Sequence, residues 1–168
     1  FSEEYAFQDD HFLIIEVAQQ WLDRSPSELL PQLGAKVPSG HSFFYPGLHY
    51  YSFSFLHGLG IDNPNTKMLL VRILHALYSM TIVLYGFKIT SLISNKKNAE
   101  TVGWILAIFW IFPLLSVRNL IEYVCIPPLM LATYLIIKHQ NSQKWFTFVG
   151  IGLIAGIAFS FRFQTILF

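Results

Sequence analysis

Four long apolar stretches constrain this chain most, because they leave it few ways to fold in water. They run over residues 68–94, 101–117, 120–137 and 145–161. An α-helix needs about 20 largely apolar residues to cross the ~30 Å hydrocarbon core of a bilayer. The chain as a whole is 54% hydrophobic and only 12% charged, against roughly 25% charged residues in a soluble domain. The sequence therefore predicts an all-α, polytopic membrane protein, with about four transmembrane helices in residues 68–168.

The short connections between these stretches differ in charge from one side to the other. Residues 94–98 and 138–144 contain no acidic residue and carry four lysines, namely Lys96, Lys97, Lys138 and Lys144. Lysine and arginine are enriched in short cytoplasmic loops, so we expect both connections to face the cytoplasm. Residues 1–67, the turn near residue 118 and the end of the last stretch then lie on the non-cytoplasmic face.

Residues 1–67 form a long first loop of a different composition. Eight of the ten acidic residues lie at or before Asp62. Between residues 12 and 23, apolar side chains recur at helical spacing and polar ones take the other face, which predicts an amphipathic helix along the membrane surface. Residues 45–59 are rich in aromatic side chains, which suit the headgroup level. We therefore divide the chain into an extracytoplasmic loop with interfacial helices (1–67) and a transmembrane region (68–168).

Two neighbouring acids, Asp9 and Asp10, precede the amphipathic helix and are followed by His11. Acids at the start of a helix are stabilised by its free N–H groups and its dipole, so a purely structural role is one interpretation. A catalytic role is the other, because the pair lies on the face where the remaining unusual charges gather.

Those remaining charges lie at the ends of the apolar stretches. Arg118 and Glu122 flank the turn between the second and third stretches, and Arg162 and Gln164 follow the fourth. Arg118 and Glu122 could pair along one helix face, Arg162 could be a snorkelling anchor, and Arg72 could either snorkel or join a site. Charge at membrane depth is costly and is normally paired or functional. Together with the acid pair, these groups suit an anionic, lipid-linked substrate.

Three segments carry a resemblance to a known family. They are FQDDHF at residues 7–12, RNLIE at 118–122 and FRFQT at 161–165. In the same order, they resemble landmarks of glycosyltransferase family 22, the GT-C mannosyltransferases that build GPI anchors and dolichol-linked oligosaccharides. The first landmark of that family lies in the first extracytoplasmic loop. The resemblance implies a polytopic GT-C enzyme that has a further helix before Phe1 and several more after Phe168.

The resemblance also implies a reaction. A sugar would move from a polyprenyl-phosphate donor to a hydroxyl of a glycan or glycolipid acceptor, with an acid of the first loop as general base. We assign this base to Asp9, with Asp10 orienting the acceptor or sharing the proton, although the sequence alone does not decide between the two acids. We expect five residues to bind substrate, with the two arginines stabilising the phosphate: His11, Arg118, Glu122, Arg162 and Gln164.

The remaining expectations concern partners and location. A lipid-phosphate donor needs no nucleotide-binding loop, so we expect no cofactor and leave the question of a divalent metal open. The formal net charge of +1 gives no reason to expect nucleic acid, and membrane lipids are the other partners. The protein would reside in a bacterial inner membrane or in the endoplasmic reticulum, with its site on the non-cytoplasmic face. The alternative is a transporter or a non-catalytic membrane subunit, with Arg118, Glu122 and Arg162 along a polar pathway.

Overall fold

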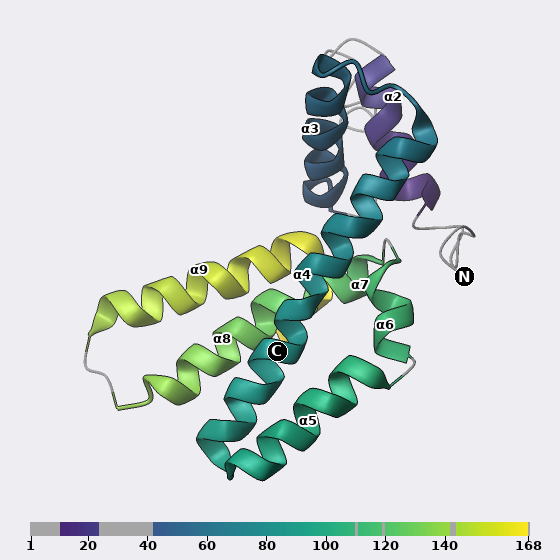
Figure 1. Cartoon of the computed structure of the whole chain (residues 1–168). Helices are drawn as coiled ribbons and strands as arrows, with labels where there is room; N and C mark the ends of the chain where they lie inside the picture. Colours follow the sequence, from purple (N-terminus) through teal and green to yellow (C-terminus); the bar gives the residue numbers. More distant parts are fainter. Residues whose placement is uncertain (1–10, 24–41, 110, 119, 142–143, 168) are drawn as a thin grey trace.

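The computed structural model is helical (Figure 1), and every regular element in the residues that it describes is a helix. It describes residues 11–23, 42–109, 111–118, 120–141 and 144–167. Two helical segments are long and apolar enough to cross a membrane, Pro64–Ile93 and Ile121–Lys138, and Trp145–Phe161 is a shorter apolar helix. The all-α class predicted from the sequence is therefore confirmed.

Helix α4 (Pro64–Ile93) is the axis of the fold. Its start is defined by Asn63, whose side chain accepts a hydrogen bond of 2.9 Å from the Asn65 backbone N–H, and by a proline at the first helical position. Both features favour helix initiation. Its 30 residues span about 45 Å, roughly 15 Å more than the hydrocarbon core. One end of α4 lies beside α3 (Phe44–Gly58) and the other beside α5 (Lys96–Ile108) (Figure 1).

The stretch 101–117 is not the single helix that its composition predicts. Helix α5 ends at Ile108, Phe109 leaves the helical conformation with φ −59° and ψ 116°, and α6 covers Ile111–Ser116. The cause is Pro113, which has no N–H to give to the carbonyl of Phe109 and whose ring clashes with a continuing helix there. The 13 residues of α5 cover only about 20 Å.

The third stretch, 120–137, is also divided. A single turn, α7 (Ile121–Val124), is followed by α8 (Ile126–Lys138). Pro127 and Pro128 lie at the first positions of α8, where a missing N–H costs little because that group has no helical partner. The two prolines therefore begin a helix.

A side chain from α4 completes the hydrogen bonding at this junction. In an unbroken helix the carbonyl of Val124 would accept from the N–H of residue 128, but that residue is Pro128. The hydroxyl of Tyr78 donates to the Val124 carbonyl instead, at 3.0 Å. The α7–α8 break is thus fixed to α4 by a bond that satisfies an otherwise orphaned carbonyl.

Helix α9 (Trp145–Phe161) has the bounds that the sequence predicts. Glycines play different parts in the packing of the helices. A Cβ atom added at Gly86 of α4 would collide with the Leu106 side chain of α5, whereas one added at Gly152 or Gly156 of α9 would meet nothing within 4 Å. At Gly86, therefore, the absence of a side chain lets α4 and α5 approach closely.

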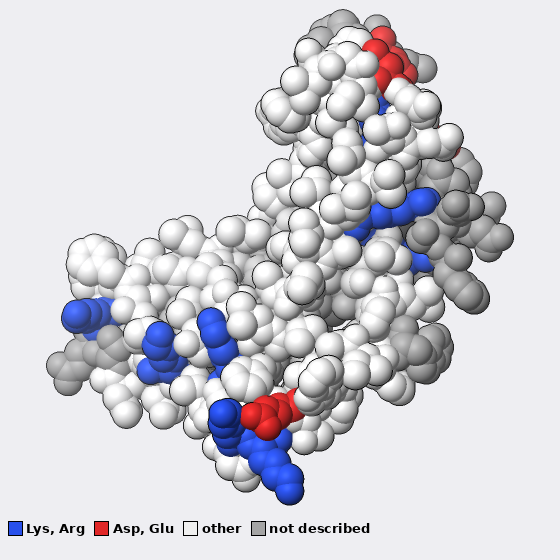
Figure 2. Space-filling view, in the orientation of Figure 1, with Lys and Arg blue, Asp and Glu red and all other residues white. Residues whose placement is uncertain are grey.

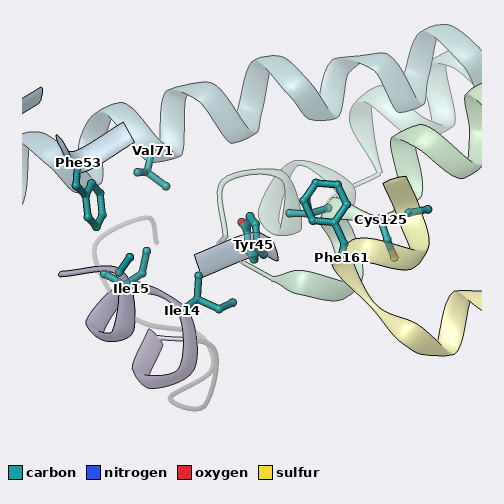
Figure 3. Packing of buried hydrophobic residues seen from close by; sticks show 10 residues of the cluster. Ile14, Ile15, Tyr45, Phe53, Val71, Cys125 and Phe161 are labelled. Carbon is teal, nitrogen blue, oxygen red and sulfur yellow. The ribbon is translucent and has the colours of Figure 1, made fainter. Parts of the chain in front are cut away.

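The amphipathic segment near the N-terminus forms a π-helix, η1 (His11–Glu16), and then α2 (Val17–Asp23). Its apolar face is covered by protein: Ala18 is fully buried, and the segment packs against α3. Ile14 and Ile15 belong to one cluster with apolar residues of α3, α4 and α9 (Figure 3). The predicted helix thus exists, but α3 covers the face that we expected lipid to cover.

A polar cluster holds the corner between α3 and α4. Gly60 turns the chain with a φ of +77°, a conformation that glycine adopts without strain. The Nδ1 of His57 donates to Oδ1 of Asp62 at 2.6 Å, and the ammonium of Lys67 lies 3.7 Å from the same oxygen. That ammonium is buried and lies 5.8 Å from the ring centroid of Phe53. The hydrogen bond from His57, aided by the charges of His57 and Lys67, holds the pKa of Asp62 below its ordinary value.

Candidate functional site

Three of the residues singled out by the sequence come together at the end of α9. Arg162 ends that helix with extended backbone, and its N–H bonds to the carbonyl of Ala158 at 3.1 Å. Its Nη1 forms an ion pair with the carboxylate of Glu122 on α7, and its Nε donates to Oε1 of Gln164 at 3.2 Å. Gln164 is held within a short 3₁₀ helix, η3 (Phe163–Leu167). A cation, an acid and an amide thus form one contiguous group.

This group leaves part of the guanidinium available. The Arg162 side chain is 31% exposed and that of Glu122 is 56% exposed. Glu122 and Gln164 engage two of the three nitrogens, which fixes the plane of the guanidinium. In the described part of the chain, no recorded side-chain contact engages the third nitrogen, Nη2. A planar, oriented and partly exposed guanidinium suits a phosphate oxygen.

Arg118 lies in the turn between α6 and α7. It is not on one helix with Glu122, because α6 ends at Ser116 and α7 begins at Ile121. The suggestion that the two pair along one helix face is therefore wrong, and Glu122 is instead the partner of Arg162. The Arg118 backbone N–H bonds to the carbonyl of Leu115 at 3.0 Å and tightens this turn.

A histidine of α4 connects this turn to α3 and α9. The Nδ1 of His75 donates to the carbonyl of Arg118 at 3.1 Å, and its Nε2 lies 2.7 Å from the hydroxyl of Tyr45. A carbonyl only accepts, so Nδ1 carries a hydrogen, and in the neutral ring Nε2 accepts from Tyr45. The Tyr45 ring packs edge-on against Phe161 at 5.6 Å, directly before Arg162. The two arginine-bearing segments are thus linked through one tyrosine and one histidine.

A cavity of about 200 Å³ adjoins this link, between α3, α4, α7 and α9. Its wall is largely apolar, and Tyr45, His75 and Tyr78 contribute polar atoms to it. The hydroxyl of Ser42 donates to the carbonyl of Ser160 and ties the start of α3 to the end of α9. The cavity therefore lies within the same junction of helix ends as the arginines.

The acid pair that we assigned to catalysis, Asp9 and Asp10, lies outside the described residues, as does the side chain of His11. The backbone of His11 begins η1. Residues one turn later in η1, Ile14 and Ile15, pack in the cluster that contains Phe161 (Figure 3). Among the described residues, no group of three His, Cys, Asp or Glu side chains is placed to hold a metal ion.

Sequence reasoning missed His75 and Tyr45. A signal existed for His75, because a histidine within the first long apolar stretch is a polar group at membrane depth and calls for a partner. No such signal existed for Tyr45, which is one of many aromatic residues in its segment. Its role depends on which helix the hydroxyl meets.

Comparison with known families decides the class of protein. The family model of dolichyl-phosphate-mannose-protein mannosyltransferases matches residues 52–168. The chain belongs to this family. Its members are polytopic GT-C membrane glycosyltransferases that use a lipid-phosphate-linked sugar, which confirms the predicted class of enzyme and removes the transporter alternative. No curated protein and no solved structure matches the chain.

The family match also bears on individual expectations. It covers Arg118, Glu122, Arg162 and Gln164, and it begins after the segment with Asp9 and Asp10. It supports the GT-C superfamily and a mannosyltransferase, but it gives no specific support for glycosyltransferase family 22. The protein is thus a membrane glycosyltransferase of the mannosyltransferase type.

Proposed function

We propose that the protein transfers a mannose-like sugar from a polyprenyl phosphate to a hydroxyl of a glycan or glycolipid, with inversion at the anomeric carbon. The observation that carries this proposal is the partly exposed Arg162 guanidinium, held by Glu122 and Gln164, in a chain of the mannosyltransferase family. Glycan or glycolipid acceptors follow from the three segments that resemble glycosyltransferase family 22.

The arginines act on the leaving group. As the bond between the anomeric carbon and the phosphate oxygen breaks, its electron pair goes to the phosphate and negative charge grows there. Fixed cations in a poorly hydrated site stabilise such charge without reorganising. In this proposal Arg162 supplies one cation, and Arg118, in the turn held by His75, supplies the other. Glu122 is a positioning residue for Arg162 because it holds the guanidinium plane.

The acid pair acts on the acceptor. Asp9 accepts the proton of the acceptor hydroxyl while the hydroxyl oxygen attacks the anomeric carbon from the side opposite the phosphate. Asp10 orients the acceptor or shares the proton, and His11 contributes to binding. The site faces the non-cytoplasmic side, in keeping with the lysines of residues 94–98 and 138–144 at the other end of the helices.

The test of the acid pair is transfer of labelled sugar from a polyprenyl-phosphate donor by membranes that contain the protein. Asp9→Asn is nearly isosteric and keeps an acceptor oxygen for helix capping, so the protein should still insert while transfer falls by about 10²- to 10⁴-fold. Asp10→Asn should reduce transfer less. If only Asp10→Asn were inactive, the base would be Asp10, and full activity of both variants in folded protein would refute the mechanism.

The arginine is tested in the same assay. Arg162→Lys keeps the charge but loses the planar fork, so the KM for the donor should rise while insertion is unchanged. Glu122→Gln should raise the donor KM less than Arg162→Lys does, since the amide oxygen still accepts a hydrogen bond from the guanidinium. Lys96→Ala removes a cation from the opposite end of the molecule and serves as control. An unchanged donor KM in Arg162→Ala would show that Arg162 is an anchor only.

A further inference from the structure

A second place where cations gather lies at the opposite end of the helices. Figure 2 shows Lys and Arg side chains along the end of the molecule where α4 meets α5 and where α8 approaches α9. Within it, the ammonium of Lys88 on α4 and that of Lys138 on α8 lie 5.6 and 5.5 Å from the ring centroid of one tyrosine, Tyr134. Lys88 is also 5.6 Å from the ring of Tyr85. We call Lys88, Tyr134 and Lys138 the Tyr134 site.

The charge of this site is not balanced within the described part of the chain. Lys96, nearby, has its own carboxylate partner in Glu100 at 3.8 Å. For Lys88 and Lys138, the described residues provide no carboxylate within 4.0 Å, and aromatic faces are their recorded partners. Two like charges near one ring repel each other, so an anion that contacts both ammonium groups would be stabilised by both.

The depth of the site matches that of lipid phosphates. Lys138 is the last residue of α8, and Tyr134 lies one turn before it. Lys88 precedes the last residue of α4 by five positions, about 7.5 Å along the axis. Tyrosine is enriched at the boundary between hydrocarbon and headgroups, and lysines near helix ends extend toward it. Apolar side chains of α4 and α9 close to these ends, such as Ile93 and Phe146, are exposed, as lipid-facing residues are.

We propose that the Tyr134 site binds the phosphate of an anionic phospholipid. Lys88 and Lys138 contact the headgroup, the two tyrosines hold their stems, and the acyl chains lie against the exposed apolar sides of the helices. Basic clusters at helix ends bind anionic headgroups in this manner. The site is distant from Arg162, and the inference does not depend on the proposed function.

Native mass spectrometry of the detergent-purified protein, at its natural length, tests this inference. Phosphatidylglycerol and phosphatidylcholine are added separately, and the bound lipid is titrated. Phosphatidylglycerol should bind more tightly, and Lys88→Ala and Lys138→Ala should each weaken it about 5-fold. Lys97→Ala is the matched control, because it removes an exposed lysine at the same end that has no recorded ring contact, and it should leave the affinity unchanged.

Three outcomes would overturn the inference. If Lys97→Ala weakened phosphatidylglycerol binding as much as the other two alanine variants, binding would reflect the general positive charge at this end of the molecule and not a specific site. Equal binding of the two lipids would mean that no anion is recognised. Displacement of phosphatidylglycerol by inorganic phosphate at equal concentration would assign the site to a soluble anion. Lys88→Gln keeps most of the stem of the side chain and should weaken binding as Lys88→Ala does, which separates loss of charge from loss of packing.

Discussion

The link through His75 predicts how the arginine-bearing turn responds when one side chain is removed. His75→Ala deletes two hydrogen bonds, from the Tyr45 hydroxyl at 2.7 Å and to the Arg118 carbonyl at 3.1 Å. Each hydrogen bond contributes roughly 0.5–1.5 kcal/mol net to stability, so His75→Ala should lower the free energy of unfolding by about 1–3 kcal/mol. A change of about 1 kcal/mol moves Tm by ~2–4 °C in a domain of roughly 150–250 residues. Tyr45→Phe deletes one bond and keeps the ring on Phe161, so it should cost about half as much.

The assay combines thermal unfolding in detergent with the donor KM of sugar transfer. His75→Asn places an amide N–H near the position of Nδ1, so it should restore the bond to the Arg118 carbonyl and recover the donor KM more than it recovers Tm. A double-mutant cycle of Tyr45→Phe and His75→Ala should show coupling, since the two share a bond. Additive losses, or a donor KM that stays normal in His75→Ala, would refute the view that His75 positions the turn.

Two further predictions concern the ends and the packing of α4. Because His57 holds the pKa of Asp62 below its ordinary value of 3.8, this pair stabilises the fold above that pH, and the stabilisation is lost as pH falls through the lowered pKa. Asp62→Asn should abolish this part of the acid dependence of Tm, and an unchanged pH profile would contradict it. Gly86→Leu should collide with Leu106 and cost roughly 1–3 kcal/mol of stability, whereas Gly152→Leu, where a Cβ meets nothing within 4 Å, should be tolerated. An equal decrease of Tm in both glycine variants would contradict the conclusion that Gly86 lets α4 and α5 approach closely.

Much of the helical framework could be predicted because apolar length is a property of the sequence alone. Helix α9 has the predicted bounds, and α4 begins four residues before the prediction because an asparagine cap and a proline extend it. The stretch 101–117 was mispredicted because average hydrophobicity gives no weight to one proline. Pro113 breaks the helix through a missing N–H, which a composition argument overlooks.

The charged residues of the candidate site could be predicted from the sequence, but which of them form ion pairs could not. A charged residue at the end of an apolar stretch calls for a partner, and this indicated Arg118, Glu122 and Arg162. Which of them pair depends on the turn between α6 and α7, which places Glu122 toward α9. The contribution of His75 needed the positions of three helices. The assignment of Asp9 as the base stays a prediction.

The bond between Tyr78 and the carbonyl of Val124 has a consequence for how this sequence can vary. The tyrosine hydroxyl is needed there because residue 128 is a proline and brings no N–H. In a chain with alanine at residue 128, the backbone itself could supply the missing donor, and phenylalanine at residue 78 would then cost little. The two positions are therefore epistatic: the tyrosine can be lost safely only after the proline, and the reverse order passes through an intermediate with an unsatisfied carbonyl.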